Sequence, residues 1–109
     1  MKIKDLALNE NFKEICIPCP DRSIDGVYAG DLLSWVMGRA KADNAWITIM
    51  SNLNVVAVAS LTDVACVILT EGVTLQEDVK ELAISKEINV LSTALTSYEA
   101  AIALNKLLI

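Results

Sequence analysis

The stretch AWITIMSNLNVVAVASLTDVACVILT, residues 45–70, decides the fold of this 109-residue chain. Its two ends, residues 45–50 and 65–70, are short apolar runs rich in β-branched side chains, and such runs are typical of buried strands. The valines of the intervening NLNVVAVASLTD favour a strand, whereas its length and its small alanines suit a helix packed on a sheet. Because two strands flank this segment, we predict a helix and a parallel βαβ unit.

The rest of the chain continues the alternation of helices and strands. Two pairs, Thr74 with Glu77 and Thr96 with Glu99, have the spacing of a capping box, so each predicts the start of a helix. The elements predicted outside residues 45–70 are helices at 2–10, 31–40, 74–86 and after 96, and strands at 13–17, 24–29 and 90–92. We therefore predict one α/β domain over residues 1–109, with a largely parallel or mixed sheet flanked by helices.

The composition indicates a globular protein with a dense core. Hydrophobic residues make up 54% of the chain, and the mean hydropathy is +0.48. Polar or charged residues nevertheless interrupt every apolar stretch well before the ~20 residues that span a bilayer. The first residues, MKIKDLALNENF, contain acids and lack the apolar core of a signal peptide. We expect a soluble, cytoplasmic protein.

The net charge and the absence of histidine exclude or disfavour several classes of function. The net charge is −5, and the nine basic residues are scattered, which disfavours nucleic acids and membrane surfaces as partners. No histidine is present. This absence removes the commonest general base, the Ser-His and Cys-His nucleophile pairs and all His-ligated metal sites. We expect no catalytic residues, no metal site and no cofactor.

Cys16 and Cys19, in the sequence CIPC, have the spacing of a redox or metal-binding pair. A zinc or iron–sulfur site needs about four ligands, and the chain offers only one further cysteine, Cys66. A redox pair of this kind normally begins a helix, but here a proline and a turn follow. Structural thiols are therefore one interpretation, and redox chemistry or a metal shared between subunits is the other.

The stretch around Gly26 and Gly30 precedes a predicted helix and invites comparison with phosphate-binding loops. It has neither the Gly-Lys-Ser/Thr ending of a P-loop nor the three spaced glycines of a dinucleotide fingerprint. We predict that Gly30 permits a tight turn and that Asp31 is the N-cap of the helix. Contacts with a ligand are compatible with that role, and the candidate ligand-binding residues are Gly30, Asp31, Ser34 and Asn54.

Apolar side chains surround almost the whole circumference of the helix predicted at residues 31–40. Such a helix must be buried on more than one side. One hypothesis is a homodimer with Trp35 and Met37 at the interface. The other is two-sided burial within a single subunit.

Three polar loops follow the predicted parallel strands, at residues 51–54, 70–74 and 92–97. Ligands of open parallel sheets bind beyond the carboxyl ends of the strands, where such loops lie. Their hydroxyl and amide side chains are also the usual caps of helices, so capping alone can explain them.

The segment GVYAGDLLSWVMGRAKADNAWITIMSNLNVVAVASLTDVACVILTEGV, residues 26–73, resembles the DRTGG-domain family, in particular its small stand-alone members. The likeness continues through NVLST and SYEAAIAL, and so extends over essentially the whole chain. Asp21 and Arg22 match the start of the motif that names the family, whereas SIDG stands where Thr-Gly-Gly is expected. The resemblance implies an α/β fold similar to the N-terminal domains of HPr kinase and of the MurE and MurF ligases.

The same resemblance implies an accessory or regulatory module, of the kind found beside CBS domains in some pyrophosphatases and within some phosphotransacetylases. Stand-alone members often lie among genes for iron-only hydrogenase components, and some carry a serine-kinase label. This sequence has no P-loop, Gly-rich kinase loop or catalytic-loop motif, so we expect no kinase activity.

We therefore predict a non-enzymatic regulatory or accessory module. It is expected to form a homodimer or to dock on a protein partner, and to bind a small metabolite or nucleotide. The alternative is a redox or metal-handling accessory protein of hydrogenase machinery that uses Cys16 and Cys19.

Overall fold

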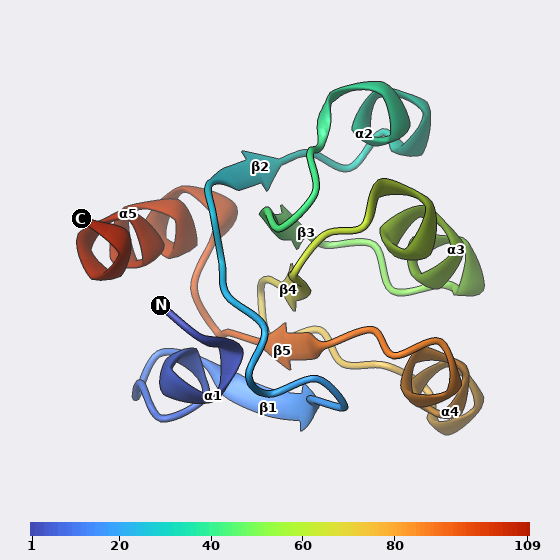
Figure 1. Cartoon of the computed structure of the whole chain (residues 1–109), viewed down its shortest axis with the longest axis horizontal. Coiled ribbons are helices and arrows are strands. Elements are labelled where there is room, and N and C mark those ends of the chain that lie inside the picture. Colours follow the sequence, from blue (N-terminus) through green and yellow to red (C-terminus); the bar gives the residue numbers. More distant parts are fainter.

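A five-stranded mixed sheet forms the centre of the molecule in the computed structural model, which describes all of residues 1–109 (Figure 1). The strand order is β1-β5-β4-β3-β2. Strands β2, β3, β4 and β5 run parallel, and β1 pairs antiparallel with β5. The strand bounds are β1 Lys13–Cys16, β2 Val27–Ala29, β3 Ala45–Thr48, β4 Cys66–Leu69 and β5 Val90–Ser92. The predicted α/β fold with a mixed sheet is confirmed.

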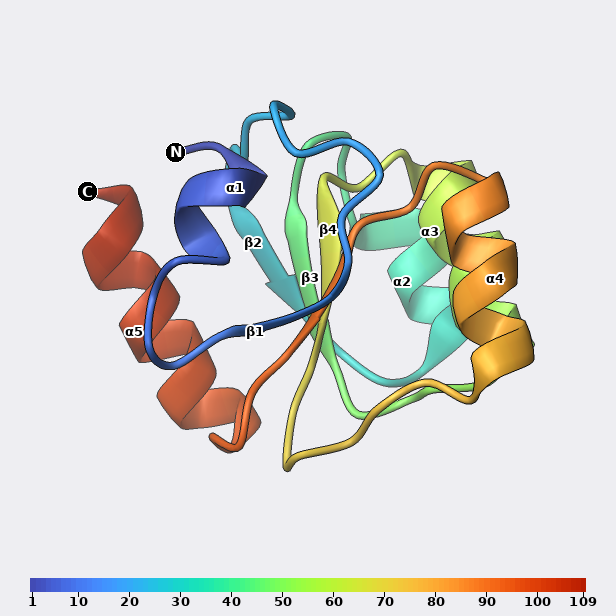
Figure 2. The ribbon, with the colours of Figure 1, turned by 90° about the horizontal axis from the view of Figure 1, so that it is seen from below.

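Helices cover both faces of the sheet. Figures 1 and 2 show α2, α3 and α4 on one face, and α1 and α5 on the other. The helix bounds are α1 Ile3–Leu6, α2 Leu33–Arg39, α3 Leu53–Thr62, α4 Glu77–Ser85 and α5 Ser97–Leu108. None of them is long and apolar enough to span a membrane.

The central strands bury side chains on both faces, because helices lie on both sides. In β4, Val67 and Leu69 belong to the core under α2, α3 and α4, whereas Cys66 and Ile68 belong to the core under α1 and α5. Every residue of β3 and β4 is buried. This two-sided burial explains the continuous apolar runs of the sequence.

Most of the predicted elements are confirmed. The strands expected at residues 13–17, 45–50, 65–70 and 90–92 are present, and the ambiguous segment between β3 and β4 is helix α3. The capping box at the start of α5 is also present, with Thr96 accepting from the backbone N–H of Glu99 at 3.2 Å.

The capping box predicted for Thr74 and Glu77 is wrong. Helix α4 begins at Glu77, its N-cap is Gln76, and no side chain caps it. Val73 and Leu75 pack against the core and hold the preceding loop extended, so the helix starts later. The strand predicted at residues 24–29 is shorter, because only Val27–Ala29 pair with β3. Ser23, just before the predicted strand, forms an isolated bridge with Lys2.

The N-cap role predicted for Asp31 is also wrong, because Leu32 occupies that position. The Asp31 carboxylate instead accepts from the Thr48 hydroxyl at 2.7 Å and from the Ile49 backbone N–H at 2.9 Å. Gly30 does not adopt a positive φ, so a tight turn is not its reason for being glycine. A Cβ there would lie 3.0 Å from the Tyr28 ring.

Helices α1 and α2 also differ from the predictions made from the sequence. Helix α1 ends at Leu6 rather than near residue 10. In α2 only Val36 is buried, and exposed fractions are 61% for Leu32, 55% for Trp35 and 53% for Met37. Two-sided burial within one subunit is therefore wrong, because α2 lies over the edge strand β2 and has α3 on one side only (Figure 1).

Candidate functional site

The loops that follow the parallel strands gather at one edge of the sheet, which we call the carboxyl edge. They are residues 49–52 after β3, 70–76 after β4 and 93–96 after β5. These are largely the three polar loops singled out in the sequence. Two hollows lie there, one on each side of the loop between β4 and α4.

The first hollow, the amide pocket, lies between the starts of α3 and α4 and has a volume of about 490 Å³. It is lined by Ser51, Asn52, Leu53, Asn54, Gln76, Asp78 and Val79. Asn52 is the N-cap of α3, and its side chain accepts from the Asn54 backbone N–H at 3.0 Å. The side chains of Asn54 and Gln76 make no hydrogen bond within the chain, so their donors and acceptors are free for a ligand.

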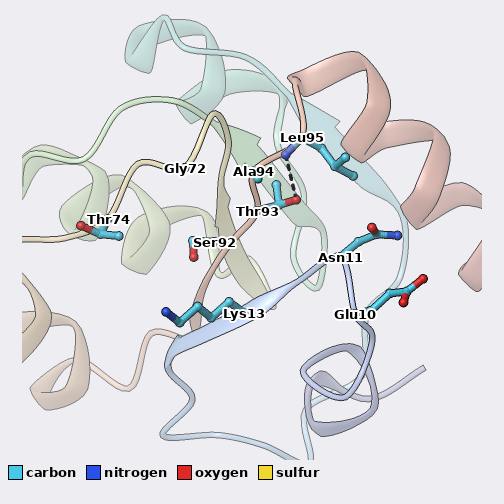
Figure 3. A pocket seen from close by; sticks show the side chains of 9 residues that line it. All are labelled: Glu10, Asn11, Lys13, Gly72, Thr74, Ser92, Thr93, Ala94 and Leu95. Atoms are coloured by element: carbon cyan, nitrogen blue, oxygen red, sulfur yellow. Dashed lines mark hydrogen bonds between the residues drawn. The ribbon is translucent and has the colours of Figure 1, made fainter.

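The second hollow, the lysine pocket, has a volume of about 360 Å³ (Figure 3). It is lined by Glu10, Asn11, Lys13, Gly72, Thr74, Ser92, Thr93, Ala94 and Leu95. These residues come from the segment leading into β1, the end of β5 and the loop before α4. The Thr93 hydroxyl is occupied, because it accepts from the Leu95 backbone N–H at 3.2 Å.

The structure separates the four predicted ligand-binding residues. Asn54 lines the amide pocket. Gly30, Asp31 and Ser34 line neither hollow: the Gly30 carbonyl accepts from the Trp46 indole at 2.9 Å, and Ser34 is exposed on α2. Ligand contacts at all four positions stay predictions.

Sequence reasoning missed Lys13. Its partner in the sheet is Ser92, some eighty positions along the chain, and the pairing of β1 with β5 cannot be read from the local pattern. The only available signal was a lone basic residue at the start of a strand in an acidic chain.

Two of the three cysteines, Cys16 and Cys66, are buried and poorly suited to thiolate chemistry. The Cys16 thiol donates to the Ile88 carbonyl at 3.7 Å, and the Cys19 thiol donates to the Glu87 carbonyl at 3.6 Å. Burial raises the pKa of Cys16, and it raises the pKa of the fully buried Cys66 to about 12. Thiols with raised pKa values are weak nucleophiles and weak metal ligands near neutral pH. No three His, Cys, Asp or Glu residues lie close enough to hold a metal ion.

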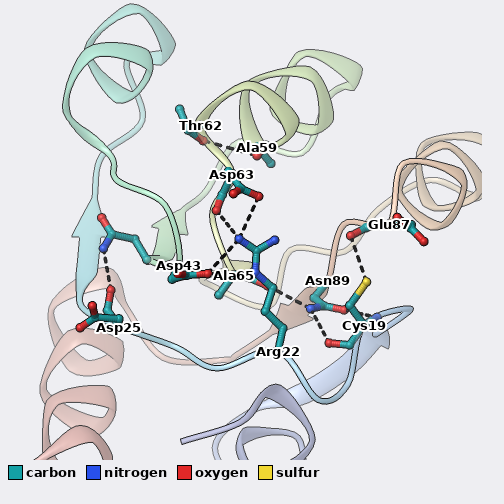
Figure 4. A network of polar contacts seen from close by, with 11 residues as sticks. Cys19, Arg22, Asp25, Asp43, Ala59, Thr62, Asp63, Ala65, Glu87 and Asn89 are labelled. Atoms are coloured by element: carbon teal, nitrogen blue, oxygen red, sulfur yellow. Dashed lines mark hydrogen bonds and ion pairs between the residues drawn. The ribbon is translucent and has the colours of Figure 1, made fainter.

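The opposite edge of the sheet, the amino edge, carries a polar network around Arg22 (Figure 4). The guanidinium donates to Asp43 at 3.0 and 3.2 Å, to the Asp63 carboxylate at 2.9 Å and to the Asp63 carbonyl. Burial lowers the pKa of Arg22, but the hydrogen bonds to Asp43 and Asp63 outweigh it, so the pKa lies above its ordinary value. Arg22 thus joins the loops before β3 and β4, in which Asp43 and Asp63 have positive φ angles.

The network continues at Asn89, a buried residue just before β5. Its side chain accepts from the Cys19 backbone N–H at 2.9 Å and donates to the carbonyls of Cys19 and Ala65, both at 3.0 Å. All of these contacts are internal to the chain. The amino edge is therefore a structural network rather than an open site.

The DRTGG domain model matches residues 28–107. This match takes in most of the chain, so the protein belongs to the DRTGG-domain family, as the sequence resemblance predicted. No curated protein matches the sequence.

Among solved structures, the chain is similar to the CBS and DRTGG domains of the regulatory region of Clostridium perfringens pyrophosphatase, complexed with the activator diadenosine tetraphosphate. The TM-score is 0.66 at 18% sequence identity, over 84% of this chain and 40% of that one. The likeness shows a shared fold. This chain thus corresponds to less than half of that regulatory region.

Proposed function

We propose that this member of the DRTGG-domain family is a non-catalytic regulatory or accessory module. In this proposal it binds a small metabolite or nucleotide at the carboxyl edge, and it associates with itself or with a partner protein through α2. The observation that carries the proposal is a pair of open polar hollows at the carboxyl edge, in which no hydroxyl or thiol is hydrogen-bonded to a general base. The cytoplasm is the proposed location.

The amide pocket supports binding of an uncharged polar group, such as a nucleobase or a sugar. Asn54 and Gln76 offer both donors and acceptors, and Asp78 adds an exposed carboxylate that can accept from hydroxyl groups. No basic residue lines this hollow. The solved relative was complexed with a nucleotide activator, which supports nucleotides as the first ligands to test.

Thermal unfolding with a panel of nucleosides, nucleotides and diadenosine tetraphosphate tests the binding proposal. We expect at least one compound to raise the Tm of the full chain. The shift should be lost in Asn54→Ala and kept in Asn105→Ala, which removes an exposed amide from α5 on the other face of the sheet. Absence of any shift, or equal shifts in both variants, would contradict binding in the amide pocket.

The exposed side of α2 supports association. Leu32, at the N-cap of α2, and Trp35 and Met37, within the helix, are exposed apolar residues, and the Arg39 guanidinium lies 4.2 Å from the centroid of the Trp35 ring. This stacking restricts the indole before association, which reduces the entropy lost at an interface. We propose first that the chain forms a homodimer through α2, with Trp35 and Met37 at the interface.

Sedimentation at micromolar concentration tests the dimer. We expect the wild-type chain to be dimeric and Trp35→Asp to be monomeric. Tyr98→Asp is the matched control, because Tyr98 is an exposed aromatic residue on α5, over the opposite face of the sheet. A monomeric wild-type chain would reject the homodimer and would leave association of α2 with a different protein as the proposal.

The alternative role for Cys16 and Cys19, in redox or metal chemistry, is not favoured by the site. Both thiols donate to backbone carbonyls, and burial raises the pKa of Cys16. Metal analysis of anaerobically purified protein tests it directly, since a stoichiometric metal that Cys16→Ser abolishes would replace the present proposal.

A further inference from the structure

Three polar side chains line one end of the lysine pocket. Lys13 and Ser92 are directly opposite each other in the register of β1 and β5, so their side chains share one face of the sheet. Thr74, in the loop before α4, lies above the same face, and Figure 3 shows all three around one hollow. They come from three segments that only the fold brings together.

None of these three side chains has a partner within the chain. Lys13 makes no ion pair, whereas Lys4 pairs with Asp21 at 2.9 Å and Arg22 pairs with two aspartates. The Ser92 residue is only 6% exposed, its side chain makes no hydrogen bond within the chain, and its hydroxyl is not among the fully buried side-chain atoms. Because Ser92 lines the hollow, its hydroxyl is accessible there and free to bind a ligand.

We infer that Lys13, Ser92 and Thr74 form a phosphate subsite for a small phosphorylated metabolite, an inference that rests on the proposed function and names its ligand class. Lys13 supplies a point charge, and the two hydroxyls supply neutral donors, the combination that a phosphate monoester requires. Lys13 is the only basic residue of the pocket.

The other end of the pocket limits what the phosphate is attached to. Glu10 and Asn11 lie there, away from Lys13 and Thr74 in Figure 3, and neither side chain has a partner. A carboxylate accepts from hydroxyl groups and repels further phosphates. A volume of about 360 Å³ is near the lower end of the ~300–1,000 Å³ range of small-molecule sites. The ligand is therefore a hydroxyl-bearing monophosphate rather than a triphosphate.

Titration of the ¹⁵N-labelled full chain with inorganic phosphate, at constant ionic strength, tests the subsite by NMR. We expect saturable shifts of the Gly72, Thr74 and Ser92 amides. Lys13→Gln should weaken this binding about tenfold, because it removes the charge-assisted contact. Lys41→Gln removes the same charge from an exposed position in a loop of the amino edge and should leave the binding unchanged.

Shifts that do not saturate, or that persist with equal affinity in Lys13→Gln, would overturn the subsite. A second series compares ribose 5-phosphate, ribose and succinate in the wild-type chain and in Ser92→Ala. We expect ribose 5-phosphate to bind more tightly than phosphate alone, ribose not to bind, and Ser92→Ala to weaken the phosphorylated probe. Succinate that binds as tightly as ribose 5-phosphate would overturn phosphate selectivity.

The two proposals fail separately. Binding that depends on Asn54 but not on Lys13 would reject the phosphate subsite and leave the amide pocket as the proposed ligand site. Binding of phosphate that depends on Lys13, together with ligand-induced Tm shifts that Asn54→Ala leaves unchanged, would reject the amide pocket only.

Discussion

The two edges of the sheet differ in their polar side chains, because unpaired ones line hollows at the carboxyl edge, beside paired ones such as Asp31 and Thr48. At the amino edge, Arg22 and Asn89 direct their hydrogen bonds to other parts of the chain. At the carboxyl edge, Lys13, Ser92 and Asn54 have side chains with no internal partner. The difference teaches that polarity alone does not mark a site. Polar groups that satisfy one another stabilise the fold, and those left unsatisfied beside a hollow are available to a ligand.

This contrast also bears on the motif that names the family. Asp21 and Arg22, which resemble the start of that motif, lie at the amino edge and precede residues 28–107, the part of the chain that the family model matches. Asp21 pairs with Lys4, and Arg22 binds the loops before β3 and β4. Neither residue lines a hollow of the carboxyl edge.

The largest expected effect is at Asn89 of the amino edge. Asn89→Ala removes three hydrogen bonds from a buried side chain, and it takes away the partner that Asn89 provides to the Cys19 backbone N–H and to the Ala65 carbonyl. We expect the free energy of unfolding to fall by about 3 kcal/mol. Urea unfolding measures it, with Asn105→Ala as the exposed control. A loss below about 1 kcal/mol would contradict a structural role for the amino edge.

Arg22 should contribute somewhat less than Asn89 to the free energy of unfolding, because its partners Asp43 and Asp63 are largely exposed. We expect Arg22→Met to lower the free energy of unfolding by about 2 kcal/mol, and the loss to shrink at high salt. The variant keeps the apolar stem, so that packing is preserved. Urea unfolding at low and high salt measures both quantities, and an effect that does not depend on salt would point to lost packing instead.

Cys66, at the start of β4, should make the protein less stable at alkaline pH. Burial raises the pKa of its thiol from 9.0 to about 12 in the folded chain. Above pH 9 the unfolded chain releases this proton and the folded chain keeps it, so stability falls as pH rises from 9 towards 12. The loss should be about 1 kcal/mol at pH 10 relative to pH 7. Urea unfolding should show a shallower dependence on pH in Cys66→Ala, and identical slopes would contradict the burial of this thiol.

The sequence predicted what depends on local pattern and missed what depends on distant pairing. Residues 45–70 predicted β3, α3 and β4, because apolar periodicity is a local property. The cap at Thr96 was predictable because no other group competes for its hydroxyl.

The predictions for Asp31 and Thr74 failed where tertiary contacts intervened. Thr48 binds the Asp31 carboxylate, and Val73 and Leu75 hold the loop around Thr74 extended against the core. The lysine pocket was missed for a related reason, since the pairing of Lys13 with Ser92 has no local signature. Asn54 lines a hollow because it follows a parallel strand, which the topology predicted.

The smallest expected effect concerns two threonines at the ends of neighbouring strands. Thr48 and Thr70 are both fully buried, but only the Thr70 hydroxyl has no partner. The Thr48 hydroxyl donates to Asp31 at 2.7 Å and accepts from the Met50 backbone N–H at 3.2 Å. The same substitution should therefore have opposite effects at the two positions.

Thr70→Val removes an unsatisfied buried hydroxyl, so the protein should become more stable by up to about 1 kcal/mol, whereas Thr48→Val should destabilise it by about 1 kcal/mol. Paired urea unfolding curves measure the difference in sign. A destabilised Thr70→Val would mean that this hydroxyl binds a group within the folded protein, such as a buried water. The Thr70 hydroxyl would then be a satisfied polar group of the carboxyl edge, although no other group of the chain pairs with it.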